Sequence, residues 1–278
     1  MARPKRDEII VGLDIGTTKV CAIVAAPTTS LPERIGGDRN WDYRYVWIRD
    51  ATFVLYALYT LGYDQEAKRF FNFIEKVANK SAQGLDVSLM YTVWGDKVPE
   101  ERHLSTSSGY KNSKPTRIGN HAAQQFQLDV YGSLIDAFYF VSKHGLKEAD
   151  KRVWRKLVMQ LVRRIDELWQ KPDYGIWEVR VAPKHYTYSK VMAWVGADRA
   201  NRSQKTLGLT NDDQIICTKL AESIKNWIWQ HCYKKDSRLL AQYPHARSAD
   251  ATNLLFVLLQ FLDKYDPLTR KIIDQTAK

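Results

Sequence analysis

From about residue 45 onward, apolar side chains recur every three or four positions along the sequence. A helix with 3.6 residues per turn places such positions on one face, so the pattern predicts a series of amphipathic helices. We expect these helices at residues 49–61, 64–79, 126–141, 153–168, 186–202, 212–233 and 250–262. Their similar lengths, and connections rich in Gly, Pro and aromatic residues, favour an all-α fold of antiparallel helical hairpins in a bundle or toroid.

Two segments lack this helical spacing. Residues 8–24 carry β-branched residues on both sides of a Gly-Thr-Thr turn, which predicts a short N-terminal β-hairpin. Residues 81–115 contain Gly, Pro and Ser with little periodicity, which predicts a long loop. A loop of that length inside a compact domain usually has a function.

The formal net charge of +11 suggests a nucleic-acid partner as a first hypothesis. The Lys and Arg residues between positions 152 and 164, however, lie opposite an apolar stripe that runs from Val153 to Leu168. A charged outer face is the ordinary state of an amphipathic helix. We therefore expect a solvated surface there and no nucleic-acid partner.

The three cysteines, Cys21, Cys217 and Cys232, are widely spaced and odd in number. Neither they nor the histidines follow a metal-ligand spacing, so we expect reduced, buried thiols and no metal site. Charged residues interrupt the apolar run near the N-terminus, which argues against a signal peptide or a membrane span. The expected localisation is cytoplasmic.

The run Asp14-Ile15-Gly16-Thr17-Thr18-Lys19 combines a Gly with two Thr residues, as a phosphate-binding turn would. Residues 9–24 resemble the first phosphate loop of the actin, Hsp70 and sugar-kinase superfamily, most closely that of the actin-like bacterial cell-division ATPase. That superfamily also needs a second phosphate loop and an adenosine-binding loop, and the later sequence offers no strand-rich partner for them. An ATP-binding fragment is one alternative interpretation of the chain.

Four longer motifs follow in order: "APTTSLPERIGGDRNWDYRYVWIRD", "RIGNHAAQQFQLDVYG", "YGIWEVRVAPKHYTYSKVMAW" and "ADATNLLFVLLQFL". Together they resemble the catalytic domain of glycoside hydrolase family 15, the group of glucoamylases, glucodextranases and bacterial trehalases. The resemblance implies an (α/α)6 barrel, here an incomplete toroid because too few helices are predicted for six pairs. It also implies a short N-terminal segment of residues 1–24 and a partial barrel of residues 25–278.

Inverting glycosidases use two carboxyl groups, one to protonate the leaving oxygen and one to activate water. Glu178 is the candidate acid, because the adjacent Trp177 could partly desolvate its carboxyl group and raise the pKa. The resemblance implies the same role, since the Glu of this Trp-Glu pair is the general acid of the family. A salt bridge with Arg180 is the structural alternative for Glu178.

Arg49 and Asp50 stand at a predicted helix start, where an Arg-Asp pair can hold sugar hydroxyls through charge-assisted hydrogen bonds. In the structural alternative, Asp50 caps the helix and Arg49 pairs locally. The resemblance implies that both bind the non-reducing glucose and that Tyr43 and Trp47 line the pocket. The remaining residues that it places at or near the substrate are Trp177, Arg180, Gln127, Asp129 and Lys190.

The general base of the family is a Glu that follows the segment resembling "ADATNLLFVLLQFL". The sequence reaches Lys278 without a matching Glu, so we expect weak or absent catalysis, and self-association through uncovered apolar helix faces. The leading interpretation is an inverting α-glucosidase that acts without a cofactor on starch-derived oligosaccharides, isomaltose or trehalose. A non-catalytic carbohydrate-binding fragment and an ATP-binding fragment are the alternatives.

Overall fold

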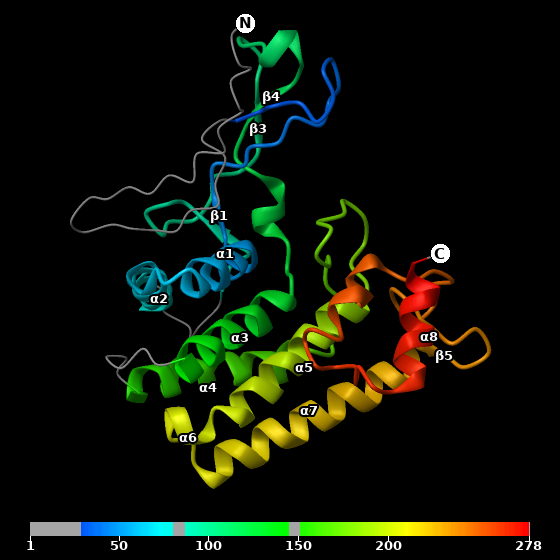
Figure 1. Ribbon diagram of the computed structural model, residues 1–278. Helices are drawn as coiled ribbons and strands as arrows, with labels where there is room; N and C mark the ends of the chain where they lie inside the picture. Colours follow the sequence, from blue (N-terminus) through cyan, green and yellow to red (C-terminus); the bar gives the residue numbers. More distant parts are fainter. Residues whose placement is uncertain (1–28, 80–86, 145–150, 278) are drawn as a thin grey trace, which may run out of the picture. The chain divides into compact units, whose positions relative to one another are not determined.

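The computed structural model of the protein describes residues 29–79, 87–144 and 151–277 (Figure 1). The β-hairpin and the phosphate-loop segment predicted before residue 25, together with Cys21, lie outside these residues. The chain forms two compact units. Unit one comprises Met1–Ala82 and Ser88–Gln124, and unit two comprises Gln83–Val87 and Gln125–Lys278.

Unit one contains a helical hairpin made of α1 (Ile48–Thr60) and α2 (Asp64–Asn79), which confirms the two helices predicted there. Helix α1 ends at a left-handed Gly62, whose φ is 88°. The amide of Gly62 donates to the carbonyl of Tyr59 at 3.0 Å, and the amide of Tyr63 donates to that of Leu58 at 2.9 Å. These two bonds satisfy the last carbonyls of α1 and turn the chain into α2.

Short strands pair in unit one. Strand β1 (Val46–Trp47) runs antiparallel to β2 (Met90–Tyr91), and β3 (Arg102–Leu104) runs antiparallel to β4 (Thr116–Ile118). The 3₁₀-helices η1 (Tyr110–Asn112) and η2 (His121–Gln124) flank β4. The long loop predicted for residues 81–115 therefore contains regular structure. Strands of two or three residues are too short to produce a readable alternation of apolar and polar residues.

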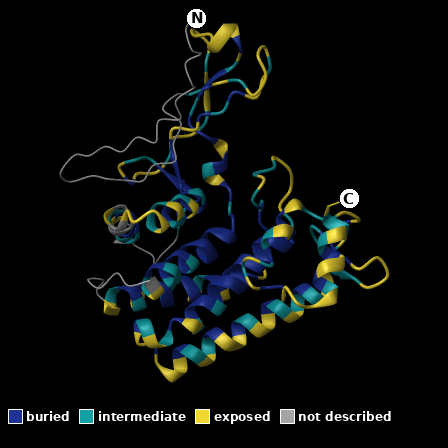
Figure 2. Ribbon diagram, viewed as in Figure 1, coloured by how far each residue is buried: buried dark blue, intermediate teal, exposed yellow. Residues whose placement is uncertain are grey.

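Unit two is built mainly from helices: α3 (Asp129–His144), α4 (Lys151–Leu168), α5 (Thr187–Arg202), the short α6 (Gln204–Leu207) and α7 (Asn211–His231). Helix α5 packs against both α3 and α7, and it is buried on nearly all sides (Figure 2). Helices α4 and α7 expose polar faces. The core of unit two therefore lies around α5, and the outer helices supply the solvated surface.

Helices α3 and α5 approach each other at two glycines. A Cβ atom added to Gly132 would lie 1.9 Å from the carbonyl oxygen of Met192, and one added to Gly196 would lie 3.2 Å from the Cα atom of Gly132. Larger residues at these positions would separate the two helices. Glycine costs an exposed helix about 1 kcal/mol relative to alanine, but here its small size permits the contact.

The basic side of α4 is solvated, as predicted. Arg152, Lys156 and Arg163 are exposed, and Arg155 forms a salt bridge of 2.8 Å with Asp213 of α7. Cys217 and Cys232 are free and buried, also as predicted. Within the described part of the chain, no helix is both long and apolar enough to cross a membrane.

The prediction of a helix at residues 250–262 is wrong. The chain forms the 3₁₀-helix η3 (Ala251–Leu255) followed by turns, in which Gln260 has a φ of 62°. The side-chain amide of buried Asn253 donates to the carbonyl of Leu240 at 2.8 Å. This contact joins η3 to the hairpin of β5 (Tyr233–Lys234) and β6 (Leu239–Leu240), and α8 (Pro267–Thr276) follows. The spacing of apolar residues in a sequence cannot predict such a tertiary hydrogen bond.

Candidate active site

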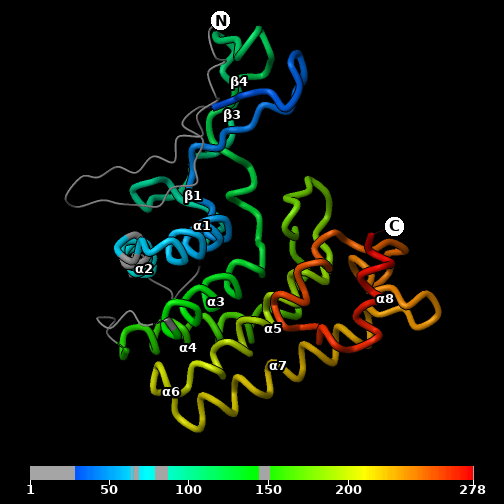
Figure 3. The backbone as a smooth tube through the Cα atoms, viewed as in Figure 1, coloured from blue at the N-terminus to red at the C-terminus, as the bar shows by residue number. Residues whose placement is uncertain are grey.

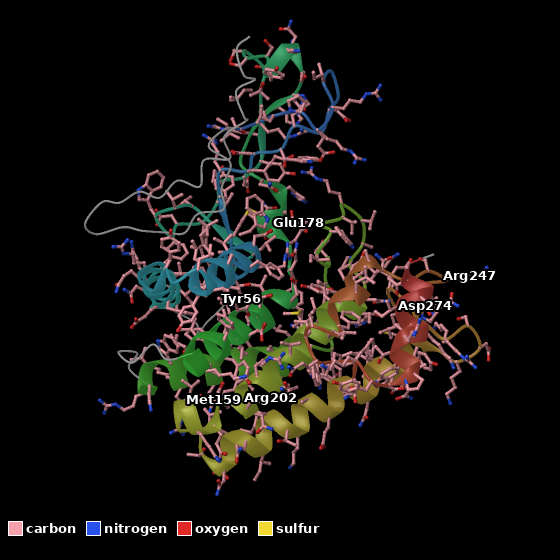
Figure 4. The ribbon with its side chains drawn as sticks, viewed as in Figure 1. Tyr56, Met159, Glu178, Arg202, Arg247 and Asp274 are labelled. Carbon is pink, nitrogen blue, oxygen red and sulfur yellow. The ribbon has the colours of Figure 1, made fainter. Side chains whose placement is uncertain are left out.

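The candidate acid lies on a loop between α4 and α5 whose ends are joined. The amide of Asp173 donates to the carbonyl of Lys184 and the amide of Lys184 donates to that of Asp173, both at 2.8 Å. A further main-chain bond of 3.1 Å links Tyr174 to Phe126, just before α3. The loop extends away from the two helices (Figure 3), and Glu178 lies on it (Figure 4). Its base is therefore fixed by main-chain bonds.

Glu178 is half-buried and has a φ of 52°, in the left-handed region that glycine favours. Backbone strain at a non-glycine residue is typical of functional sites. The side-chain amide of Gln125 donates to the carbonyls of Glu178 and Val179, each at 3.4 Å. Gln127 in turn donates to Gln125 at 3.1 Å. Buried Gln127 thus reaches the acid through Gln125, a residue that the sequence patterns did not identify.

Trp177 is 57% exposed, yet its indole nitrogen is bound. Its N–H donates to Oδ2 of Asp250 at 2.8 Å, across 73 positions in the sequence. The ring beside Glu178 therefore has a fixed edge and an accessible surface. Aromatic rings of this amphipathic kind recur where proteins contact sugars. Arg180, on the same loop, is exposed.

A buried charge cluster lies beneath the base of the loop. The pKa of Asp173 is raised to about 7, chiefly by burial and in part by the charge of Asp129. The hydroxyl of Ser189, the amide of Leu128 and the charge of Lys190 act in the opposite direction. The amide of Leu128 donates to Oδ2 of Asp173 at 3.0 Å. The carboxyl group of Asp173 thus attaches the loop to the start of α3.

Lys190 is fully buried in α5, and burial lowers its pKa to about 8. Its ammonium group donates to the carbonyls of Trp169 and Lys171, at 2.5 and 2.7 Å, just after α4. Asp129 is also fully buried, at the first position of α3. These contacts support the framework of the loop. The substrate contact predicted for Lys190 stays a prediction, as does that of Asp129.

The four residues predicted to hold the sugar in unit one surround the start of α1. Trp47 is the N-cap residue, and its ring centroid lies 5.7 Å from that of Tyr43, which is 42% exposed. Buried Arg49 pairs with Asp50 of the first turn, with Nε and Oδ2 3.8 Å apart. The structural alternative, in which Asp50 caps the helix, is therefore wrong, because the N-cap residue is Trp47. The local pairing of Arg49 that it also predicted is present.

Asp42, which the sequence patterns did not single out, organises the chain just before this pair. Arg44 donates to both carboxylate oxygens at 2.8 Å, and Tyr45 and the amide of Gly119 donate to Oδ2 at 2.9 and 3.0 Å. Burial favours the neutral acid, but the hydrogen bonds outweigh it and hold the pKa of Asp42 below its ordinary value. The side-chain amide of Asn120 donates to the carbonyl of Asp42 at 3.1 Å.

The predicted site residues therefore fall into two groups. Tyr43, Trp47, Arg49 and Asp50 lie together in unit one, and Gln127, Asp129, Trp177, Glu178, Arg180 and Lys190 lie in unit two. A common cavity for the two groups stays a prediction. Among the described residues, no three His, Cys, Asp or Glu side chains gather as metal donors.

A family model described as "Glycosyl hydrolases family 15" matches residues 15–276. A trehalase of Mycolicibacterium smegmatis is 42% identical over 91% of this chain and 37% of its own length. Trehalase 1 of Sulfolobus acidocaldarius is 38% identical over 90% of this chain and 42% of its own. The chain thus spans less than half the length of these curated relatives.

Two kinds of solved structure share the fold. The structure described as "Glycosidase Wild Type" matches with a TM-score of 0.67 at 17% identity, covering 91% of this chain and 63% of its own. A glucoamylase from Saccharomycopsis fibuligera matches with a TM-score of 0.54 at 14% identity, covering 82% and 50%. These likenesses show the fold class predicted from the sequence, an all-α toroid of helical hairpins. The short N-terminal β-hairpin of that prediction lies outside the described residues.

Proposed function

The chain belongs to glycosyl hydrolases family 15, and we propose that it acts in the hydrolysis of α-glucosides, with trehalose as the first candidate substrate. The trehalases that share about two fifths of its residues over most of its length support this choice. The family match from residue 15 favours a glycosidase over the ATP-binding alternative.

Glu178 is the proposed general acid, which gives its proton to the glycosidic oxygen as the bond to the leaving sugar breaks. The observation that carries this role is the geometry of its loop: the ends are closed by main-chain bonds, and Gln125 holds the backbone of the acid itself. A fixed acid needs little reorganisation when the substrate arrives.

Arg49 and Asp50 are the proposed clamp for the non-reducing glucose, with the rings of Tyr43 and Trp47 beside it. The buried guanidinium of Arg49 and the half-exposed carboxylate of Asp50 present donors and acceptors of fixed direction. Charged partners form stronger hydrogen bonds with hydroxyl groups than neutral ones do. An inverting reaction also requires a second carboxylate as the base, and the proposal assigns that role to no described residue.

Turnover of trehalose by the wild-type chain and by the Glu178→Gln variant tests the acid. We expect NMR to show one β-glucose and one α-glucose as the initial products, because water inverts one anomeric carbon and the leaving glucose keeps its configuration. The rate in the variant should be lower by about 10² to 10⁴. Glu222→Gln, at an exposed position of α7, is the control and should retain the wild-type rate. Equal turnover by wild type and Glu178→Gln would refute the acid assignment.

A wild-type chain that binds trehalose without cleaving it would support the carbohydrate-binding alternative instead. This alternative is favoured by one observation, the accessible Trp177 ring, because sugar binding needs such a surface and no second carboxylate. Calorimetric titration with trehalose distinguishes the two functions. A cytoplasmic setting is also proposed, and the two free, buried cysteines support it.

A further inference from the structure

Both carboxylate oxygens of Asp250 accept hydrogen bonds. Its Oδ1 accepts from the amide and the hydroxyl of Thr252, at 2.8 and 2.6 Å. Its Oδ2 accepts from the side-chain amide of Gln242 at 2.7 Å and from the indole N–H of Trp177 at 2.8 Å. One oxygen thus caps η3, and the other holds a side chain of the loop that carries the proposed acid.

The position of Asp250 is fixed by the framework of unit two. The amide of Thr187, at the start of α5, donates to the carbonyl of Gln242 at 2.8 Å, and the amide of Gln242 donates to that of Ser248 at 3.0 Å. The amide of Asn253 donates to the carbonyl of Asp250 at 3.0 Å. The backbone that carries the carboxylate is therefore linked to the start of the buried helix α5 through main-chain bonds.

The bound Trp177 ring is otherwise open. Trp177 is 57% exposed, although the one polar atom of its side chain, the indole nitrogen, already donates a hydrogen bond. An indole of this exposure without a partner would exchange between rotamers, whereas the bond to Asp250 fixes the ring plane. The neighbouring backbone is fixed as well, because Gln125 binds the carbonyls of Glu178 and Val179.

We infer that Asp250 is a positioning residue that acts through Trp177, so that the indole forms a rigid, preoriented platform for a pyranose ring beside the acid. The inference rests on the proposed function for its ligand, a glucose unit of an α-glucoside. Ordering a side chain before binding removes a cost that binding would otherwise carry. The expected contribution is to affinity more than to the chemical step.

Asp250→Asn tests this role selectively. Asn is as good a cap residue as Asp, so its carbonyl oxygen can keep the contacts with Thr252. Its NH₂ group then faces two donors. The amide of Gln242 can turn and accept, but the indole of Trp177 is a donor only and loses its partner. Asp266→Asn is the matched control, because Asp266 caps α8 through Leu268 at 2.8 Å and binds no indole.

The first measurement needs no sugar. The ¹H–¹⁵N resonance of the Trp177 indole is identified by its absence in Trp177→Phe. We expect Asp250→Asn to shift this resonance and to accelerate its exchange with water, and Asp266→Asn to leave it unchanged. Thermal melting and circular dichroism establish that each variant is folded. An unchanged Trp177 resonance in folded Asp250→Asn would overturn the inference.

The second measurement is affinity for trehalose, with KM where turnover occurs. We expect Asp250→Asn and Trp177→Phe each to weaken binding about 3- to 10-fold, with a smaller effect on kcat. The double variant should bind no more weakly than Trp177→Phe alone, because Asp250 acts through the indole. Additive losses would overturn the inference. If the resonance shifts as expected but the wild type binds no sugar, the proposed function fails while the fixed indole stands.

Discussion

Glu178, the proposed general acid, has an unfavourable backbone conformation. Its φ of 52° costs a residue with a Cβ atom about 1 to 2 kcal/mol, a cost that glycine avoids. The sequence alone does not reveal this strain, because a Trp-Glu pair is compatible with any backbone geometry. We interpret the strain as the consequence of orienting the proposed acid from a loop whose ends are closed.

We expect Glu178→Gly to be more stable than Glu178→Ala by about 1 kcal/mol, since both lack the carboxyl group and only alanine retains the Cβ strain. Urea unfolding of the two variants measures the difference. Lys219 of α7 offers the control, since alanine is the better helix former and Lys219→Gly should be less stable than Lys219→Ala by a similar amount. A Glu178→Gly variant that is less stable than Glu178→Ala would contradict the interpretation.

Burial of Asp173 makes the free energy of unfolding depend on pH. Its pKa is raised from 3.8 to about 7 in the folded chain, chiefly by burial. Between these values the native state holds a proton that the unfolded state has lost, so stability falls as pH rises. Asn imitates the neutral acid and has no such titration. From pH 5 to pH 7.5 we expect the free energy of unfolding of wild type to fall by about 2 to 3 kcal/mol relative to Asp173→Asn.

Urea unfolding of both chains at the two pH values checks this expectation. The comparison stays below pH 8, near which Lys190 also begins to lose its proton. Asp166→Asn, at an exposed position of α4, serves as the control and should show no such difference. A difference that is constant with pH would mean that Asp173 titrates near its ordinary pKa.

Sequence patterns identified the residues with distinctive local motifs, such as Trp177 and Glu178, but not their supports. Gln125, Asp42 and Asp250 act through contacts with residues 53, 77 and 73 positions away. Asp42 and Gln125 lie inside quoted motifs, and Asp250 is the second residue of the last one. Only the folded chain reveals which of the polar residues in these motifs hold distant segments of their own unit together.

At the scale of elements, apolar spacing predicted the long helices well, because packing of an amphipathic face stabilises them. Helix α7 was predicted at residues 212–233 and observed at Asn211–His231. The segment at residues 250–262 was mistaken for a helix because its apolar residues follow the same period. Buried Asn253, bonded to Leu240, holds this segment in 3₁₀-helix and turns instead.

Gly132→Ala tests the contact between α3 and α5. Alanine is normally the better helix former by about 1 kcal/mol, but its Cβ would lie 1.9 Å from the carbonyl oxygen of Met192. The two helices would have to separate, so we expect a destabilisation of roughly 3 kcal/mol or more, measured by urea unfolding. Gly208→Ala, with φ 67° and nothing within 4 Å of an added Cβ, should cost only about 1 kcal/mol. A neutral Gly132→Ala would refute the close packing.

At the scale of the whole molecule, the all-α class and the family could be predicted from the sequence, since ordered motifs extend over most of the chain. The division into two units could not, because unit one draws together segments that precede and follow residues 83–87. The self-association predicted from uncovered apolar faces stays a prediction. The structure supplies candidates for its surface: Leu258 is 77% exposed and Tyr265 is 81% exposed.

We expect the sedimentation coefficient to rise with protein concentration, since exposed apolar side chains promote association. Leu258→Gln should weaken this dependence in analytical ultracentrifugation without altering the thermal melt. Thr218→Gln, at an exposed position of α7, controls for the added amide. A concentration-independent monomer for the wild type would rule out association through these residues.

The paired main-chain bonds between Asp173 and Lys184 close the segment between them into a loop with two fixed ends. Because these two bonds use backbone atoms alone, they place no demand on the side chains of the residues between the two anchor points. The helices of unit two and the loop that carries the proposed acid can then change independently in sequence.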